Sequence, residues 1–394
     1  MSDEFYRIKR LPPYVIAEVN AMRHAARRSG KDIIDLGMGN PDRPPPQHVI
    51  DKLCEVAAKP SAHGYSQSRG IPGLRKAQAN YYARRFGVEL DPEREVVVTM
   101  GSKEGLSSMA TAIVAPGDVV LAPSPSYPIH TYGFIIAGAT IRSVPTTPNE
   151  EYWDALDQAM AYTSPRPSVL VVNYPSNPTA ETVDLAFYER LVAWARENKV
   201  WVLSDLAYSE LYYDGKPTRS ILEVPGAKDI AVEFTSMSKT YSMAGWRMGF
   251  AVGNPTLIAA LTRVKSYLDY GAFTPIQAAA CAALNGPQDI VEENRLRYQR
   301  RRDVMVESFT RAGWEIPSPP ASMFAWAPLP PGFEHMGSLD FSKQLLEQAG
   351  VAVAAGIGYG EEGEGYVRIA MVENEQRIRQ AARNIKRFLQ RSNA

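Results

Sequence analysis

Cysteine is scarce in this chain, which has only Cys54 and Cys281 among 394 residues. The two lie far apart and lack the clustered spacing of a zinc site or a disulfide framework. The sequence therefore predicts two buried free thiols, no metal site and a reducing compartment. Residues 1–10 mix charges of both signs without the apolar segment of a secretory signal, and no run of about 18 apolar residues could span a membrane. We expect a cytoplasmic protein.

An excess of charge of either sign is also missing. Lysine plus arginine and aspartate plus glutamate each number 43, so the formal net charge is zero. A chain with this balance has no extended field to gather nucleic acid or an anionic membrane. We expect no nucleic-acid or membrane partner, and a small neutral or zwitterionic substrate instead.

The pattern that is present is an alternation of short β-branched runs with amphipathic stretches, beginning near Glu95. It is typical of βα units around a mostly parallel sheet, and a chain of this length exceeds what one core usually serves, so we expect two closely associated domains. Several strand candidates are apolar throughout, as in strands covered on both faces. The candidates are residues 95–100, 118–122, 140–144, 168–174, 200–204, 230–235 and 247–252.

The last third of the chain has a different pattern. A long amphipathic helix is predicted over 288–312, after which the proline-rich stretch 316–331 breaks the periodicity. Strands near 351–354 and 366–371, followed by a helix to the end, predict a smaller α+β domain. A further helix, over 184–198, belongs to the first pattern.

The strongest local signal is Lys239, in Thr235-Ser236-Met237-Ser238-Lys239, just beyond an apolar strand and eight residues before Arg247. A lysine at the mouth of a parallel sheet faces the crevice where such proteins bind ligands. Partial desolvation beside cations lowers its pKa toward the neutral amine that forms Schiff bases. Ser236 and Arg247 are placed to reach an anion beside it. A lone lysine at a strand end is more often simply exposed, so the interpretation depends on the residues that accompany it.

Asp205 ends the apolar run 200–204, where a carboxylate is costly unless it meets a cation. A protonated pyridine nitrogen, as in pyridoxal 5'-phosphate (PLP), is such a cation, and a facing aspartate keeps it protonated. A helix cap or a structural ion pair is the alternative for Asp205. Tyr208 and Asn177 could hydrogen-bond the 3'-oxygen of the same ring, although each alone would pass as a loop residue.

Phosphate and ring contacts have weaker candidates. Gly101-Ser102-Lys103 follows a strand and opens a helix, whose N-terminal amides favour an anion. It lacks the spacing of a nucleotide triphosphate loop, and an ordinary helix start is the alternative. Tyr127 follows the next strand and could cover the face of the pyridine ring, or merely pack in a proline-rich loop.

Arg368 and Gly39 are the candidates for binding substrate. Arg368 lies in a strand-like run, where its fork of donors suits an α-carboxylate, unless it is only paired at an interface. Gly39 lies in a glycine turn after the apolar residues 33–36 and would let backbone approach a ligand closely.

Taken together, these motifs resemble the class I and II aminotransferases, from Arg7 to the C-terminal helix and in that family's order. The resemblance implies PLP fold type I, an aspartate aminotransferase-like α/β fold with a mostly parallel seven-stranded sheet and a smaller α+β domain. It implies an N-terminal segment (1–44) joining the small domain, a large PLP-binding domain (45–287) and a small domain (288–394). The runs 11–14, 63–70, 205–208 and 265–271 look like bacterial glutamate-pyruvate (alanine) aminotransferases, with LL-diaminopimelate aminotransferases as the runner-up.

The resemblance also implies roles for single residues. Lys239 would bind PLP and move the proton between the substrate's Cα and the cofactor, while Asp205 would hold the ring nitrogen. Tyr65 would reach the phosphate across a homodimer interface, and Tyr14 would close over the substrate. No arginine is evident for a distal carboxylate, with Arg43 and Arg69 as guesses. The remaining implied contacts are Tyr208 and Asn177 to the 3'-oxygen, Tyr127 to the ring face, Gly101, Ser102, Lys103 (through its backbone amide), Ser236, Ser238 and Arg247 to the phosphate, and Arg368, Gly39 and Asn177 to the substrate.

Three other functions remain open at this point. A PLP-dependent carbon–sulfur β-lyase could use the same fold and cofactor residues. A dinucleotide-dependent oxidoreductase rests on the weak glycine run 356–360, which no helix follows. A transcription regulator with an aminotransferase-like sensor would need a DNA-binding module for which the chain has no spare length.

Overall fold

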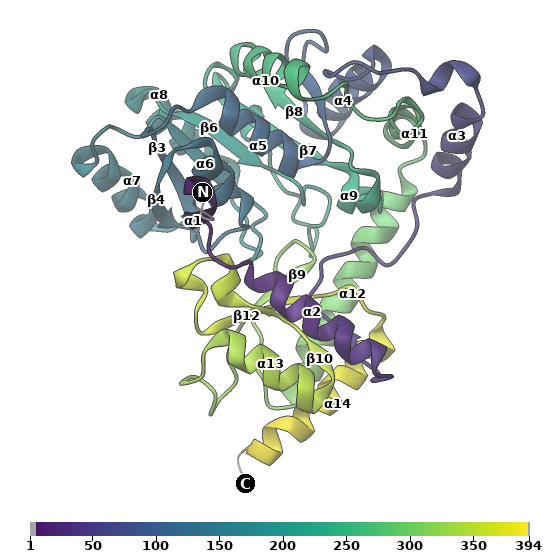
Figure 1. Ribbon diagram of the computed structural model, residues 1–394, viewed down its shortest axis with the longest axis vertical. Coiled ribbons are helices and arrows are strands. Elements are labelled where there is room, and N and C mark those ends of the chain that lie inside the picture. The colour runs from purple at the N-terminus through teal and green to yellow at the C-terminus, as the bar shows by residue number, and fades with distance from the viewer. Residues whose placement is uncertain (1–4, 393–394) are drawn as a thin grey trace.

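A seven-stranded sheet forms the centre of the larger lobe in the computed structural model, which describes residues 5–392 (Figure 1). Its strand order is β2-β8-β7-β6-β5-β3-β4, and β8 runs in the opposite direction to the other six strands. The prediction of a mostly parallel seven-stranded sheet is confirmed. The strands are β2 (Val96–Thr99), β3 (Val119–Ser124), β4 (Thr140–Pro145), β5 (Val169–Asn173), β6 (Trp201–Asp205), β7 (Ala231–Ser236) and β8 (Gly249–Gly253).

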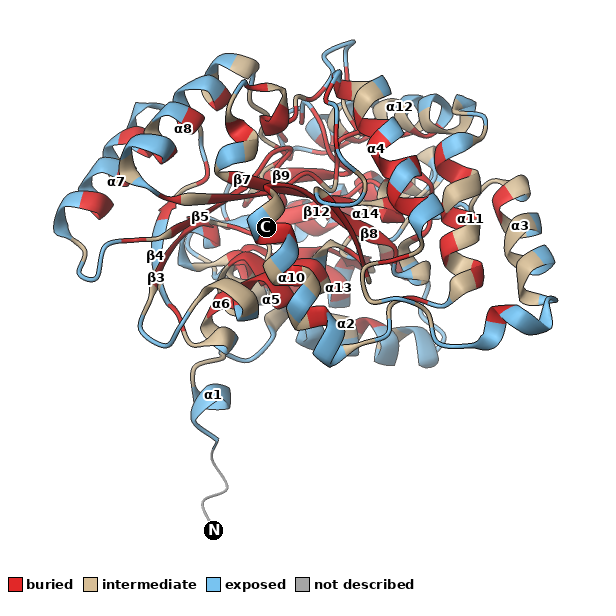
Figure 2. Cartoon of the chain, turned by 90° about the horizontal axis from the view of Figure 1, so that it is seen from above, coloured by how far each residue is buried: buried red, intermediate tan, exposed pale blue. Residues whose placement is uncertain are grey.

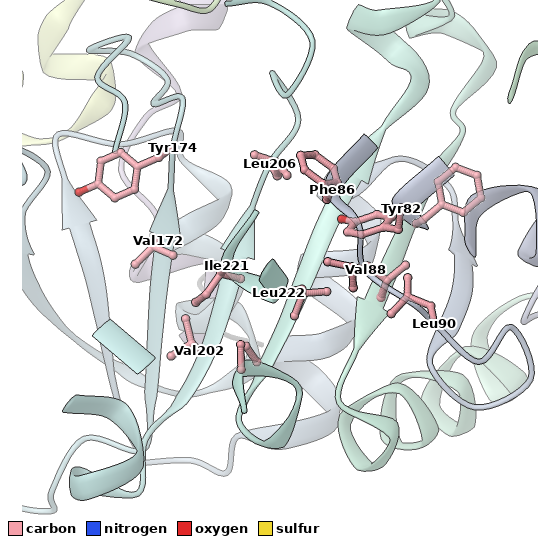
Figure 3. Packing of buried hydrophobic residues seen from close by; sticks show 14 of the residues in the cluster. Tyr82, Phe86, Val88, Leu90, Val172, Tyr174, Val202, Leu206, Ile221 and Leu222 are labelled. Atoms are coloured by element: carbon pink, nitrogen blue, oxygen red, sulfur yellow. The ribbon is translucent and has the colours of Figure 1, made fainter. Parts of the chain in front are cut away.

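Helices cover both faces of this sheet, which explains the apolar strands. In β2, Val96 and Val98 pack into one core while Val97 packs into the other. Figure 3 shows part of the first core, where Tyr82 lies beside Phe86 and Val202 lies near Ile221. The first core is covered by α3 (Gln47–Ala57), α4 (Pro72–Phe86), α7 (Glu150–Tyr162), α8 (Leu185–Asn198) and α11 (Thr274–Asn285), and the second by α5 (Ser102–Ile113), α6 (Ile129–Ala137) and α10 (Pro255–Leu268).

One carboxyl group is buried inside this lobe. Glu233 on β7 is fully buried and accepts hydrogen bonds from the Tyr82 hydroxyl at 2.8 Å, the Ser204 hydroxyl at 3.0 Å and the Ser220 hydroxyl. Burial raises the pKa of Glu233 to about 7. The acid thus links α4 to two central strands at a position away from the cavity described below.

The smaller lobe has its own core, below the large sheet in Figure 1. Its three-stranded antiparallel sheet has the order β11-β12-β9, and β1 from the N-terminal segment pairs in parallel with β10. Helix α12 runs from one lobe to the other (Figure 1). The elements are β1 (Ile34–Asp35), β9 (Phe324–Pro328), β10 (Val351–Ala352), β11 (Ala354–Ala355), β12 (Tyr366–Ala370), α2 (Val15–Arg28), α12 (Asp289–Arg311), α13 (Ser338–Ala349) and α14 (Glu375–Ser392). The domain boundaries at 44/45 and 287/288 stay a prediction.

Two expectations change. Strand β9 lies inside the proline-rich stretch where the pattern seemed to stop, because Phe324, Ala325 and Ala327 are buried in the smaller core. The two thiols are free, but Cys54 is exposed on α3 and Cys281 is only partly buried, so the prediction of two buried thiols is wrong.

Two features concern the surface. The four-residue helix α1 (Tyr6–Lys9) stands away from the rest of the chain (Figure 2). Among residues 5–392 no helix is both long enough and apolar enough to cross a membrane.

Candidate active site

The carboxyl ends of the parallel strands open into a cavity of about 520 Å³ between the two lobes. Strand β6 ends at Asp205, and β7 leads through Ser236 into the short helix α9 (Met237–Thr240), which carries Lys239. Of the residues predicted for the site, all but Gly101 and Tyr65 line this cavity. They are Tyr14, Gly39, Ser102, Lys103, Tyr127, Asn177, Asp205, Tyr208, Ser236, Ser238, Lys239, Arg247 and Arg368.

Lys239 has the chemistry expected of a nucleophilic amine. Burial, followed by the positive charges of Arg368 and Arg247, lowers its pKa from 10.5 to about 7. Its Nζ donates a hydrogen bond to the backbone carbonyl of Gly39, and no carboxylate is among the groups that shift its pKa. A large fraction of this amine is therefore neutral near pH 7.

Asp205 is held by a buried histidine. The Nε2 atom of His130 on α6 lies 2.9 Å from Oδ2 of Asp205, while Oδ1 accepts the backbone N–H of Ala207 at 3.2 Å. The Asn173 side chain also donates to the backbone carbonyl of Asp205 at 2.7 Å. His130 is fully buried, and its Nδ1 has no hydrogen-bond partner in residues 5–392. The proton assigned to Nε2 by this network makes His130 a donor to the carboxylate.

The start of α5 and Arg247 form a site for an anion. Gly101 precedes α5 with a φ of +84°, and a Cβ there would lie 2.2 Å from a guanidinium nitrogen of Arg247. Arg247 is fixed by donating to the carbonyls of Ala244 at 2.9 Å and Met100 at 3.3 Å. Glycine is thus required at 101, both for the backbone conformation and for the close approach of the cation. Free amides at the helix start beside a guanidinium suit a phosphate group.

Arg368 lines the cavity from strand β12 of the smaller lobe. It donates to Oδ1 of Asn177 and to the carbonyl of Gly37, each at 2.9 Å, and its guanidinium lies 3.8 Å from the ring centre of Phe324. A Cβ on Gly39 would come within 2.5 Å of the same ring. The glycine turn therefore brings backbone close to the arginine that is expected to hold a carboxylate.

The glycine turn is tied to the helix that precedes it. Oδ1 of Asp35 accepts the N–H groups of Gly37 at 3.1 Å and Met38 at 3.3 Å, and Oδ2 is paired with Arg23 of α2. Tyr14 directly precedes helix α2; it lines the cavity and is 48% exposed. The pairing links the segment that carries Tyr14 to the turn that contacts Arg368.

Aromatic rings line the space between these two ends. The Lys103 Nζ lies 5.5 Å from the ring centre of Tyr127, which is itself 6.0 Å from the ring of His130. Tyr208 packs edge-on against Phe324 at 5.6 Å, and burial raises the pKa of its phenol. Burial also raises the pKa of the Tyr127 phenol. Tyr127 and Tyr208 therefore stay protonated near neutral pH and can donate hydrogen bonds.

Three residues considered for the site do not reach it within this chain. Tyr65 is 88% exposed and packs against Tyr270, with the ring centres 4.5 Å apart. Arg69 donates to the carbonyl of Glu93 and lies 3.5 Å from its carboxylate, and neither Arg69 nor Arg43 lines the cavity. A role for either arginine in binding a distal carboxylate stays a prediction.

Two contributors to the site were missed from the sequence, His130 and Asn173. A single histidine in an apolar stretch has no spacing signal, and its meaning depends on Asp205, 75 residues away. Asn173 was read only as part of a strand and loop. The pairing of β5 with β6 places it opposite Asp205.

Comparison with known proteins defines the class. Residues 31–385 match the family described as aminotransferase class I and II. The chain is 64% identical to the putative aminotransferase AatC of Rhizobium meliloti and 52% identical to the glutamate-pyruvate aminotransferase AlaC of Escherichia coli. These alignments cover 98% and 97% of this chain, and 96% and 93% of the relatives. An LL-diaminopimelate aminotransferase of Moorella thermoacetica is 43% identical, over 98% of both chains.

A solved structure shows the same fold. A single mutant of the aspartate aminotransferase of Thermus thermophilus superposes with a TM-score of 0.90 at 30% identity, covering 98% of this chain and all of that one. The chain therefore belongs to the class I and II aminotransferases. It is an enzyme of PLP fold type I.

The cavity fits the PLP cofactor of this family. It has a buried carboxylate for a protonated ring nitrogen in Asp205, an amine with a lowered pKa in Lys239, and an anion site formed by Arg247 beside the start of α5. By contrast, the glycine run once considered for a dinucleotide forms a short 3₁₀ helix (Gly356–Tyr359). Gly356 packs against the backbone of Gly363, where a Cβ would lie 2.0 Å from the carbonyl oxygen, so glycine at this position serves the packing of two chain segments.

Proposed function

We propose that this enzyme transfers the amino group of L-alanine to 2-oxoglutarate, giving pyruvate and L-glutamate. The observation that carries the reaction type is the amine of Lys239, whose pKa is lowered to about 7 within a cavity that also presents Asp205 and Arg368. The preference for alanine and glutamate is supported by the 52% identity with a glutamate-pyruvate aminotransferase over nearly the whole chain.

Each residue has a defined task in this proposal. Arg368 binds the substrate carboxylate. Lys239 takes the proton from the substrate's Cα and returns it at C4' of the cofactor. Asp205 holds the proton on the ring nitrogen, and His130 keeps that carboxylate oriented. When bound, PLP supplies an electron-withdrawing ring that stabilises negative charge at Cα. The first substrate leaves as an oxoacid, and a second oxoacid accepts the nitrogen by the reverse sequence.

The other cavity residues hold the cofactor in the proposal. Tyr208 and Asn177 contact its 3'-oxygen, and Tyr127 covers the ring face. Gly39 and Asn177 contact the substrate, and Tyr14 closes over it. Two groups of residues bind the phosphate. Gly101, Ser102 and Lys103 lie at the start of α5, and Ser236, Ser238 and Arg247 lie between the end of β7 and the beginning of β8.

The products decide between this function and its alternatives. Purified enzyme with L-alanine and 2-oxoglutarate should form glutamate and pyruvate without free ammonia, and Lys239→Ala should lose more activity than any single binding-residue variant. Near-normal turnover by that variant would contradict the role of the amine. Release of ammonia and pyruvate from cystathionine would instead indicate a β-lyase.

A second candidate substrate has support from the comparisons. The 43% identity to an LL-diaminopimelate aminotransferase spans 98% of both chains, so LL-diaminopimelate belongs in the same assay. A panel of L-amino acids, each added to the holoenzyme while the visible band of the cofactor is followed, separates the two. Conversion by alanine and glutamate but not by LL-diaminopimelate supports the proposal.

We also propose a homodimer in which Tyr65 reaches the phosphate site of the other subunit. The support is a group of exposed aromatic and aliphatic side chains near Tyr65, whose ring packs against that of Tyr270. Light scattering should give twice the chain mass, and Tyr65→Phe should weaken PLP affinity without changing that mass. A monomeric holoenzyme with full activity would refute this arrangement. The group consists of Tyr65, Tyr267, Leu268, Tyr270 and Phe273.

A further inference from the structure

Tyr359 has a buried hydroxyl group with no hydrogen-bond partner. The residue is only 3% exposed, and its hydroxyl oxygen is without a partner among residues 5–392. Burial raises the pKa of the phenol, so it stays protonated and remains a donor at neutral pH. A buried donor without an acceptor is destabilising, and native proteins rarely keep one unless another group uses it.

The surroundings of Tyr359 point to the cavity. The Arg368 guanidinium carbon lies 5.0 Å from the centre of the Tyr359 ring, and Nε of Arg368 is a second buried donor without a partner in the described chain. The phenols of Tyr14 and Tyr127, which both line the cavity, also influence the pKa of Tyr359. Two unused donors thus occur together at the arginine that binds carboxylates in the proposed function.

The backbone and ring of Tyr359 are fixed in this place. Its carbonyl accepts the N–H of Ser126 at 2.8 Å, one residue before Tyr127, and its ring meets Trp326 edge-on at 5.9 Å. Trp326 pairs with Arg368 across β9 and β12. The ring is therefore held by the same two segments that hold Tyr127 and Arg368, and the hydroxyl cannot turn outward to water.

An unpartnered hydroxyl is not by itself a binding group, as Tyr152 shows. Tyr152 is also buried, and its hydroxyl also has no partner in residues 5–392. Its ring neighbours are Trp153 and Phe187, and burial alone shifts the pKa of its phenol. Tyr359 differs because a cation and two cavity-lining phenols surround it.

We propose that Tyr359 is a further substrate-binding residue, whose hydroxyl donates a hydrogen bond to the carboxylate that Arg368 binds. The inference rests on the proposed function, in which Arg368 receives the carboxylate of the amino acid or oxoacid. Tyr359 is buried beside Arg368 and is not among the residues that line the cavity, so the hydrogen bond forms as the carboxylate is drawn against Arg368. Because this carboxylate is common to every substrate, Tyr359 contributes to the binding of all of them.

The test is Tyr359→Phe in the holoenzyme, which removes the hydroxyl and leaves the ring. A lost hydrogen bond to a charged group corresponds to about a tenfold or larger rise in KM. We expect that rise for alanine, pyruvate, glutamate and 2-oxoglutarate alike, with PLP affinity unchanged. The melting temperature without substrate should be unchanged or higher, because an unsatisfied buried group has been removed. Tyr152→Phe is the matched control and should leave all four KM values unchanged.

Three outcomes would overturn the inference. These are unchanged KM values in Tyr359→Phe, a rise confined to glutamate and 2-oxoglutarate, or an equal rise in Tyr152→Phe. If the wild-type enzyme does not use alanine, the proposed substrates fail, and the same comparison is then made with the amino acid that does convert the cofactor. The two failures are therefore distinguishable.

Discussion

The lowered pKa of Lys239 makes a quantitative prediction about how the apoenzyme takes up PLP. A neutral amine attacks the aldehyde of PLP and a protonated one does not. With a pKa of about 7, about half of the Lys239 side chains are neutral at pH 7. A lysine at its ordinary pKa of 10.5 would be neutral in roughly one molecule in three thousand. Covalent uptake should therefore rise with pH only to about 7 and then level off.

The assay is the rate at which the visible absorbance of bound PLP appears after mixing with apoenzyme, from pH 5.5 to pH 9.5. Dividing each rate by that of Nα-acetyl-lysine at the same pH removes the titration of PLP itself. The ratio should be largest below pH 7 and fall about tenfold per pH unit above it, because the free lysine continues to gain neutral amine. Arg368→Gln should move the midpoint to higher pH, because it removes a positive charge that lowers the pKa of Lys239. A ratio that stays constant up to pH 9.5 would refute the reasoning.

Three further substitutions test the surroundings of the site. His130→Phe removes the hydrogen-bond donor to Asp205, and a hydrogen bond to a charged group is worth about 1.5–3 kcal/mol. PLP affinity, measured by equilibrium dialysis, should therefore weaken about tenfold or more. Unchanged affinity would argue against the role of the histidine. Gly101→Ala introduces a Cβ 2.2 Å from the guanidinium of Arg247 at a φ of +84°, so we expect weaker PLP binding and a lower melting temperature of the apoenzyme, and unchanged PLP affinity would contradict the role of this glycine. Glu233→Gln tests stability. The pKa of Glu233 is raised from 4.5 to about 7 in the folded protein, so between these pH values the unfolded chain releases its proton more readily. The wild-type protein should therefore lose about 3 kcal/mol of stability as pH rises from about 4.5 to 7. The glutamine variant lacks this loss, and its melting temperature relative to wild type should increase between pH 5 and pH 8; a constant difference would contradict the assignment.

Much of the fold was predictable because the central strands are buried on both faces. Runs such as 96–98 and 169–172 are apolar without alternation, since Val169 and Val171 face one core while Leu170 and Val172 face the other. The turn chemistry at their carboxyl ends then identified the polar residues that converge on the cavity. Strand β9 was not predictable in this way, because its neighbouring prolines are typical of a loop and its apolar residues only acquire meaning against the smaller core.

The parts of the site that could not be predicted depend on pairs that are distant in sequence. His130 became significant only when α6 was placed against the end of β6. Arg69 carries no local signal of its contacts with the backbone carbonyl and the carboxylate of Glu93, which lies 24 residues further along the chain. Local sequence records the chemistry of one side chain, whereas tertiary packing decides which partner neutralises or orients it.

The reversed direction of strand β8 explains how Arg247 reaches the proposed phosphate site. The parallel strands present their last residues to the cavity, but β8 runs the other way, so the residue that reaches the same edge is one that comes before it, Arg247. Only residues 240–246 separate Lys239 from Arg247. This short turn sets the spacing between the amine and the guanidinium, and two of its residues, Tyr241 and Met243, are packed in the core of the larger lobe. The distance between the two functional groups is therefore fixed by the same packing that stabilises the sheet.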